Sequence, residues 1–452
     1  MYNAYVTRIK NLRKHTNADR LQCGECFGNT VVVSLEYEDN QLGVYFPTDG
    51  RLSQDFAERN NLLRKKDENG NNIGGYMDPE KRNVTAVRLR GEKSDGLFLP
   101  LTSLESFGDI STLKEGDIIN NFNGHLICEK YIPRTNVRVG KVSDGNRTRK
   151  KKDPISPLFA EHADTEQLAY NLGAFKPGDE IEITLKMHGT SQRTGYLPRL
   201  VGYKRTLWDK ITRKPGKPIY DYGYVSGTRR VVLDDYDGGY YGSNEFREQH
   251  SKMFEGKLMK GETVYYEVVG FTHTGTPIMG DCQNKKLNDK EFVKQYGEIT
   301  RFSYGCKPIV SIDCDDLQSD IYVYRMTMTN EDGFVVEYTP DFMRYRCEQM
   351  GVKTVPVFSK FIIPEEVYNE TEYQATNCGA YVQQVAEEFY DGPDPVGKTH
   401  VREGVVVRIL NRPKFTAYKH KNFAFKCLEG IVKANAEAPD MEEAQETSDN
   451  DA

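Results

Sequence analysis

The chain has 452 residues, of which 38% are hydrophobic and 28% charged, and its formal net charge is −6. This length predicts two or three domains, and the absence of a long apolar run argues against a membrane span. The first residues do not form a signal peptide, and the nine cysteines are scattered. We therefore expect a cytoplasmic, monomeric protein with reduced thiols and no membrane partner.

The acidic side chains are unevenly distributed. Seven of them, and no basic residue, lie between Glu437 and Ala452. The rest of the chain then has 61 basic and 60 acidic side chains, so the net charge does not exclude local basic surfaces that bind phosphates. We predict a disordered acidic tail over residues 434–452.

Residues 1–130 contain short β-prone runs separated by Gly, Asn and Asp turns, which predicts a small all-β domain. The runs are Tyr5–Ile9, Val31–Leu35, Leu42–Phe46 and Asn83–Leu89. The segment His15–Leu21 (HTNADRL) resembles an element of the tRNA-binding OB modules of synthetases. This resemblance favours a five-stranded OB-like β-barrel, a fold that commonly binds single strands of nucleic acid.

A basic linker follows over residues 131–154. From Arg134 to Lys152 it has eight basic residues and one aspartate, among Gly, Asn and Ser. Such a run is either a solvated linker or a segment that contacts phosphates, and it predicts a domain boundary in both cases.

Residues 155–433 alternate between strand-like and helical patterns, which predicts a mixed α+β domain with antiparallel sheets. The predicted strands are Glu180–Leu185, Val264–Phe271, Ile321–Met328, Gly333–Tyr338, Gly404–Ile409 and Asn422–Lys426. The predicted helices include Asn288–Tyr296 and Cys378–Tyr390.

One predicted strand ends in a Lys-x-x-Gly turn at Lys186-Met187-His188-Gly189. The glycine permits close approach of a second backbone, and a lysine held there is a candidate covalent nucleophile if its neighbours keep it neutral. The pattern alone is equally that of a surface lysine before a turn.

Three later strands carry candidate partners. Glu267 lies at the centre of an apolar strand, where a carboxylate is costly unless it is paired. Tyr324 is an aromatic that would stack on a purine, although an aromatic in a strand is more often part of the core. Glu403 precedes Gly404 at the mouth of a buried strand and suits a contact with a metal-bound water.

The segment Tyr418–Lys426 (YKHKNFAFK) contains three lysines, at positions 419, 421 and 426. Like charges this close are unfavourable unless an anion neutralises them, which predicts a polyphosphate. A solvent-facing strand edge is the alternative, and it suits Lys419 and Lys421 better than Lys426.

The order of these motifs resembles the covalent nucleotidyltransferase superfamily of ligases and capping enzymes. His188 in Lys-Met-His-Gly-Thr and the closing Lys419-His420-Lys421-Asn422 are similar to RNA ligases. A predicted OB domain before the ligase domain resembles the RNA ligases with an N-terminal OB module. The resemblance covers residues 155–430 in its motifs, and the first 130 residues in outline.

The resemblance implies an ATP-dependent RNA ligase that uses Mg²⁺ or Mn²⁺ and joins 3′-hydroxyl and 5′-phosphate RNA ends, in a nicked duplex or in tRNA. Lys186, followed by Gly189, would form a lysyl–AMP phosphoramidate. Glu267 would bind the ribose hydroxyls, Tyr324 the adenine, and Glu403 a metal through water.

The same resemblance implies cations for the phosphates. Lys419, Lys421 and Lys426 are all candidates for the α-phosphate, because the closing motif is ambiguous. Arg229 and Arg230 are the first candidates for the ATP phosphates and the RNA 5′-phosphate, and Lys204–Arg205 is the second.

The chain departs from many relatives at Leu185, where they have a glutamate before the lysine. Two other interpretations stay open. One is a DNA ligase or a capping guanylyltransferase, which usually has its OB domain after the closing motif. The other is a non-catalytic RNA- or tRNA-binding OB protein with a degenerate transferase domain.

Overall fold

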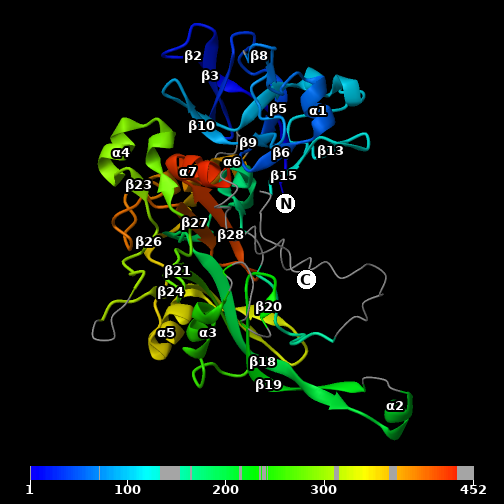
Figure 1. Ribbon diagram of the computed structural model, residues 1–452, viewed down its shortest axis with the longest axis vertical. Coiled ribbons are helices and arrows are strands. Elements are labelled where there is room, and N and C mark those ends of the chain that lie inside the picture. The colour runs from blue at the N-terminus through cyan, green and yellow to red at the C-terminus, as the bar shows by residue number, and fades with distance from the viewer. Residues whose placement is uncertain are drawn as a thin grey trace. The chain divides into compact units, whose positions relative to one another are not determined.

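The computed structural model describes residues 2–70, 72–132, 153–162, 165–212, 216–233, 236, 241, 243–309, 315–365 and 374–434 (Figure 1). It divides into two compact units. Unit 1 comprises Met1–Arg134, Cys282–Thr300 and Asn422–Asn435, and unit 2 comprises the segments between and after them. Most of the basic linker and nearly all of the acidic tail lie outside the described residues.

The sheets of unit 1 are small and antiparallel. Three of them have three strands each: β1(Tyr5–Arg8)-β5(Leu42–Phe46)-β12(Leu97–Pro100), β2(Lys10–Lys14)-β3(Leu21–Cys26)-β4(Asn29–Ser34), and β15(Cys128–Lys130)-β6(Gly50–Leu52)-β9(Asn83–Val84). The two-stranded ones are β7(Lys65–Lys66)-β8(Asn72–Gly74), β10(Ala86–Leu89)-β11(Glu92–Asp95), β13(Asn121–Phe122)-β14(His125–Leu126) and β22(Cys282–Gln283)-β23(Ile299–Thr300).

The helices of unit 1 are α1(Gln54–Arg59), α4(Lys290–Tyr296) and α7(Phe423–Ala434), with 3₁₀ turns η1(Leu101–Phe107) and η4(Asn284–Leu287). Val6, Val44, Phe46 and Phe56 belong to one buried core that joins β1, β5 and α1. The first 130 residues are thus mainly β, with the short helix α1 and the turn η1 in addition, and no closed barrel forms among the described strands. The OB barrel stays a prediction.

The predicted strand Asn422–Lys426 is wrong, because this segment begins helix α7. The side chain of Asn422 accepts a hydrogen bond of 3.1 Å from the backbone N–H of Phe425. This side-chain bond satisfies an N–H that the first turn of a helix leaves unpaired. The alternation of Phe423 and Phe425 imitates a strand only over three residues, and Leu428 on the next turn is fully buried.

Unit 2 is built on two sheets. The first has six antiparallel strands in the order β20(Val232–Leu233)-β19(Lys217–Gly227)-β18(Thr190–Lys204)-β21(Glu262–Gly270)-β24(Ser319–Thr329)-β25(Val335–Glu337). The second has five in the order β16(Glu166–Gln167)-β28(Thr416–Lys421)-β27(Gly404–Ile409)-β17(Glu180–Leu185)-β26(Val357–Ile362), of which only β16 and β28 run parallel among the described pairs.

The helices of unit 2 are α2(Leu207–Thr212), α3(Glu245–Lys252), α5(Pro340–Met350) and α6(Gln374–Glu387), with 3₁₀ turns η2(Leu168–Tyr170) and η3(Leu172–Ala174). Within the described ranges, every helix is too short or too polar to cross a bilayer. The cysteines of the described ranges are all free thiols.

Side chains alternate between the two faces of the five-stranded sheet, and only one face is covered by the apolar core. Ile181, Ile183, Val405 and Val407 point to one face, where they pack with Val382 of α6 in a single core. The other face receives the intervening residues, which are the more polar ones. The mixed α+β architecture predicted for residues 155–433 is confirmed.

A buried ion pair joins the start of β21 to α5. Glu262 is fully buried, and Arg346 approaches its carboxylate with Nε at 2.9 Å and Nη2 at 2.8 Å. Tyr338 donates a further hydrogen bond of 3.0 Å to the same carboxylate. A charge this deep depends on all of these partners, because water cannot replace them.

We predict that Arg346→Ala lowers the free energy of unfolding by about 3–5 kcal/mol, because the Glu262 charge stays buried without its partner. Lys252→Ala is the control. It breaks an exposed 2.7 Å pair with Glu248 and is expected to cost about 1 kcal/mol or less. Urea unfolding followed by circular dichroism measures both, and equal small losses would contradict the prediction.

Candidate functional site

Three neighbouring strands of the five-stranded sheet end at the same edge. Antiparallel pairing sets Leu185 of β17 opposite Val405 of β27, and the N–H of Lys186 donates to the carbonyl of Gly404 at 3.0 Å. On the other side of β27, Gly404 lies opposite Lys421 of β28. Strand register therefore gathers Lys186, Glu403 and Lys421 from distant parts of the sequence.

The carboxylate of Glu403 lies between these cations. Its Oε1 is 2.7 Å from Nζ of Lys186 and 3.2 Å from Nζ of Lys421, and its Oε2 is 3.5 Å from Nδ1 of His188. The side chain of Glu403 is 2% exposed, whereas that of Lys186 is 22% exposed. The lysine amine is thus the member of the group that an incoming molecule can reach.

The charge state of Glu403 follows from these neighbours. Burial acts to raise the pKa of this carboxyl, but Lys186, Lys421 and His188 together hold the pKa well below its usual range. Its Oε2 is buried, and its nearest donor among the described residues is Nδ1 of His188 at the long distance of 3.5 Å. A negatively charged oxygen with so weak a contact is a suitable acceptor for a metal-bound water.

Besides the carboxylate of Glu403, His188 contacts two uncharged aromatic side chains. Its backbone N–H donates to the hydroxyl of Tyr304 at 2.8 Å, and its ring meets Phe302 edge-on at 4.6 Å between centroids. Burial raises the pKa of Tyr304 well above its ordinary value and lowers the pKa of His400 beside it. Burial therefore favours the uncharged forms of Tyr304 and His400, although the charge of the buried Asp394 also acts on both side chains.

Gly189 lies where β21 passes close to the lysine turn. A Cβ added at this position would lie 2.9 Å from Cγ of Glu267, and the carbonyl oxygen of Val268 would be closer still. Only glycine fits this approach without displacing β21. It brings the half-buried Glu267 next to the turn that follows Lys186.

Tyr324 occupies a β-bulge in β24. Pairing with β21 joins Tyr265 to Arg325 and Tyr266 to Val323, so Tyr324 is the extra residue between them. Its hydroxyl lies 3.0 Å from Oγ of Ser191, which pairs across the strands with Glu267. Glu267 and Tyr324 therefore border the same region of the six-stranded sheet.

The ring of Tyr324 also has a neighbour that no sequence motif indicated. The ring of His162 lies 5.3 Å from it, and Nδ1 of His162 is 3.0 Å from Nη1 of Arg325. Arg325 forms an ion pair with Glu337. His162 precedes the recognised motifs, so only the folded chain reveals that it lies beside them.

Two buried arginines hold the strand that follows Gly189. Arg247 of α3 donates to Oγ1 of Thr190 at 2.6 Å and to the carbonyl of Ser191 at 3.1 Å. Arg193 donates to the carbonyls of Thr228 at 2.9 Å and Arg230 at 3.3 Å. Neither arginine was predicted, because neither belongs to a motif, yet both position the predicted residues.

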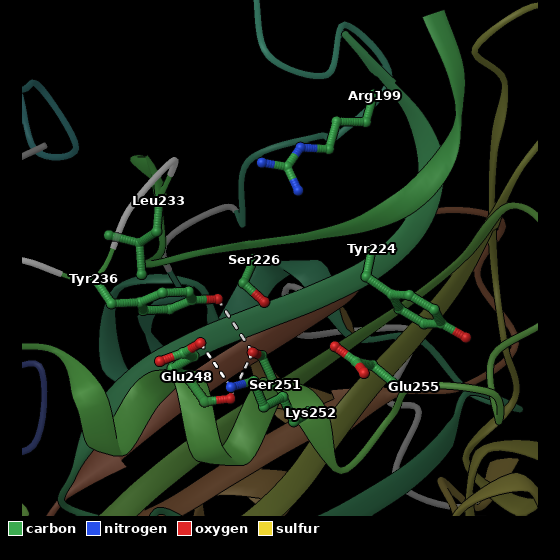
Figure 2. Close-up of a pocket in the computed structure, with 9 residues that line it drawn as sticks. All are labelled: Arg199, Tyr224, Ser226, Leu233, Tyr236, Glu248, Ser251, Lys252 and Glu255. Carbon is green, nitrogen blue, oxygen red and sulfur yellow. Dashed lines mark hydrogen bonds and ion pairs between the residues drawn. The ribbon is translucent and has the colours of Figure 1, made fainter. Parts of the chain in front are cut away.

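Arg193 thereby orders the segment that carries Arg229 and Arg230. In the structure Arg229 is partly buried and Arg230 is exposed. Ser226, at the start of the same segment, lines a pocket of about 420 Å³ together with Arg199, Tyr224, Leu233, Tyr236, Glu248, Ser251, Lys252 and Glu255 (Figure 2). This pocket is therefore polar, and it contains none of the residues grouped around Glu403.

The three candidate closing lysines are in different surroundings. Lys421 contacts Glu403, and Lys419, two residues earlier on β28, points to the same face of the sheet. Lys426 belongs to unit 1, where its Nζ lies 2.6 Å from Asp95.

Lys204 and Arg205 lie at the far end of β18 from Gly189. This strand has 15 residues and spans roughly 50 Å. This separation along one strand argues against a contact with an ATP phosphate at Lys186, and the pair stays a prediction for the RNA phosphates.

Among the described residues, no group of three His, Cys, Asp or Glu side chains is arranged to hold a metal ion. A metal at Glu403 would thus depend on a single carboxylate together with ligands from a bound substrate. Mg²⁺ is commonly bound in this way, through one or two carboxylates and substrate phosphates.

The fold is similar to that of solved RNA ligase structures. A structure of the Naegleria gruberi RNA ligase with ATP and Mn is 18% identical, with a TM-score of 0.53, over 94% of this chain and 98% of that chain. The same ligase with AMP and Mn is 17% identical, with a TM-score of 0.53, over 94% and 97% of the two chains. Its structure with PPi is 18% identical, with a TM-score of 0.54, over 93% and 97%.

The chain has the fold of an RNA ligase. The similarity extends over nearly the whole of both chains, so unit 1 and unit 2 both belong to the shared fold. No family model matches the sequence, and no curated protein matches it. In this ligase fold the site around Glu403 was brought together by strand register, which sequence comparison does not detect.

We predict that Glu403→Gln destabilises the ligase fold in a pH-dependent way. A carboxyl whose pKa is lowered by folding contributes stability above its unfolded pKa, about 4.3, and loses this contribution as the pH falls further. The difference in unfolding free energy between wild type and variant is therefore expected to be full at neutral pH and to shrink below about pH 4. Urea unfolding across this range measures it, and a constant difference would contradict the prediction.

Proposed function

We propose that the protein is an ATP-dependent RNA ligase that joins 3′-hydroxyl and 5′-phosphate RNA ends through lysyl–AMP and RNA–adenylate intermediates. The observation that carries the proposal is the partly exposed side chain of Lys186, paired with the buried Glu403, which also contacts Lys421, within an RNA-ligase fold. The similar Naegleria gruberi ligase structures with ATP, AMP and PPi support ATP as the nucleotide.

In the first step, Nζ of Lys186 attacks the α-phosphorus of ATP, the P–N bond forms, and pyrophosphate leaves. Nζ of Lys186 lies 2.7 Å from Oε1 of Glu403, and an amine attacks only after it has lost its proton. When the Glu403 charge is drawn to another cation, Lys186 faces Lys421 without a counter-charge, which favours loss of its proton. Lys421 then neutralises charge on the α-phosphate as it develops.

The residues at Glu403 fit a divalent metal bound through water. Oε2 is buried and negatively charged, and among the described residues it has only a long contact of 3.5 Å with Nδ1 of His188. When bound, Mg²⁺ or Mn²⁺ would supply charge neutralisation at the phosphates and help align the displacement. Mn in the similar ligase structures supports this assignment.

Adenosine binding is assigned to the region bordered by Glu267 and Tyr324. The carboxylate of Glu267, beside Gly189, is suited to accept hydrogen bonds from the ribose hydroxyls. The ring of Tyr324 would stack on the adenine, in competition with the ring of His162 that lies 5.3 Å away. Binding of ATP would thus require a shift of His162.

The second and third steps transfer AMP to the RNA 5′-phosphate and then expel it when the 3′-hydroxyl attacks. We assign Arg229 and Arg230 to the phosphates, because Arg193 fixes the backbone that carries them. The small β-sheets of unit 1 are assigned, as an OB-like module, to holding the RNA.

We predict that incubation with ATP labelled at the α-phosphate and Mg²⁺ leaves a label on the denatured protein. Lys186→Ala removes the nucleophile and is expected to abolish this label. Lys360→Ala removes a lysine of the same sheet that pairs with Asp341, and it should keep the label. Absence of label on folded wild-type protein would overturn the proposal, and label from GTP in place of ATP would indicate a capping enzyme.

We further predict that Lys421 is the closing lysine that binds the α-phosphate. Lys421→Ala is expected to lower the rate of labelling by about 10²–10³-fold, since it removes a preorganised charge from the site. Lys426→Ala, which instead breaks the contact with Asp95, is expected to leave the rate nearly unchanged. A larger loss for Lys426→Ala than for Lys421→Ala in single-turnover labelling would contradict this assignment.

A further inference from the structure

Strands β18 and β19 extend well beyond the sheet to which they belong. β21 pairs with β18 only from Thr190 to Gly195, and β20 pairs with β19 only at Ser226 and Gly227. Residues 196–204 and 217–224 therefore form a two-stranded arm with no further strand beside it among those described, and α2 lies at its end (Figure 1). An isolated two-stranded ribbon is only marginally stable. We therefore infer that this long arm has a function of its own.

One face of the arm carries a row of aromatic rings. Tyr220, Tyr222 and Tyr224 alternate along β19 and therefore point to the same side. Tyr196 on β18 stacks on Tyr224 with ring centroids 4.8 Å apart. Nζ of Lys260 lies 4.8 Å from the centroid of Tyr222, which adds a cation to the row.

The tip of the arm exposes large apolar side chains. Leu207, Trp208 and Ile211 of α2 are 78%, 74% and 73% exposed. Thr206 and Asp209 exchange hydrogen bonds in the manner of a capping box, which fixes the start of this short helix. Trp208 is thus presented to solvent by a defined local structure, and it is the only tryptophan in the chain.

Positive charge is concentrated on the same arm. From Arg199 to Asp221 the sequence has seven basic and two acidic residues, and Asp209 is one of those two. The exposed Lys204 lies directly opposite the exposed Lys217, with Arg205 next in the chain. Like charges at opposed positions destabilise a strand pair, unless an anion lies between them.

We propose that this arm, residues 196–212 and 216–224, binds single-stranded RNA outside the nucleotide site. Bases would stack on the tyrosine row and on Trp208, while Lys204, Arg205 and Lys217 contact phosphates, a combination typical of single-strand binding surfaces. The arm is rich in lysine, which protein–protein interfaces disfavour, so a nucleic acid fits better than a protein partner. The choice of RNA rests on the proposed ligase function.

The pocket shown in Figure 2 lies at the root of the arm. Tyr224 ends the tyrosine row and lines this pocket, and Arg199 of β18 lines it as well. An RNA strand that follows the tyrosine row from the tip would therefore reach this polar pocket, next to the segment that carries Arg229 and Arg230. A bound RNA strand would therefore run from the tip of the arm towards the six-stranded sheet of unit 2.

Fluorescence of Trp208 tests the proposal directly, since no other tryptophan contributes. A single-stranded oligoribonucleotide of mixed sequence is titrated into the full chain without ATP. We expect the emission of Trp208 to be quenched on binding, and the double variant Lys204→Glu/Lys217→Glu to bind at least about tenfold more weakly. The slope of log K against log salt concentration should become shallower by roughly 0.7 for each phosphate that the variant does not neutralise.

Lys307→Glu is the matched control, an exposed lysine of unit 2 away from the arm, and it should bind as wild type does. Anisotropy of labelled RNA provides a second measurement. Equal RNA affinity of wild type and the double variant, or a Trp208 emission that RNA leaves unchanged, would overturn the proposal. So would Trp208 emission that changes with protein concentration alone together with a dimer in sedimentation, because the surface would then bind a second copy.

The two proposals fail separately. Binding is measured without ATP, so a protein that forms no lysyl–AMP can still bind RNA at the arm. A protein that is labelled normally by ATP, with RNA binding unaffected by the double variant, would refute the arm alone.

Discussion

A carboxylate with almost no exposure to water stays ionised only if positive charges take the place of the lost solvent, and Glu403 meets this requirement through Lys186, Lys421 and His188. The two lysines depend on Glu403 in turn, because its negative charge offsets the repulsion between them. The pairing of β17, β27 and β28 therefore determines whether these charges are neutralised. A change in any strand's register would leave a charge buried and unpaired at a cost of several kcal/mol.

The same contacts leave one oxygen of Glu403 only weakly satisfied. Oε1 lies 2.7 Å from Nζ of Lys186, whereas Oε2 has only a long contact of 3.5 Å with His188 among the described residues. In the proposed reaction, an incoming cation would attract the carboxylate of Glu403. The amine of Lys186 would then lie beside Lys421 and the bound phosphate. Around this centre, Arg193 and Arg247 provide rigid support through hydrogen bonds to backbone and side-chain oxygens of neighbouring segments.

Much of the site was predictable because its residues lie in strands with strong alternation. The apolar runs around Lys186, Glu267 and Glu403 predicted β17, β21 and β27 with small errors at their ends. The closing segment was harder, because Phe423-Ala424-Phe425 fits a strand over three residues while the capping bond from Asn422 starts a helix. His162 was not predicted, since nothing near it in the sequence indicates that its ring lies against Tyr324. The long β18–β19 arm was not predicted either, because its exposed tip carries no regular pattern.

The amino-acid order alone identified the strands, the lysine turn and the candidate carboxylates, since local alternation and glycine placement depend only on neighbouring residues. It left Lys419, Lys421 and Lys426 as equal candidates for the same role. The folded structure separated them: Lys421 meets Glu403, Lys419 shares its face, and Lys426 pairs with Asp95 in unit 1. Only the folded chain decides this, because the pairing of distant strands and the start of a helix determine which charges become neighbours.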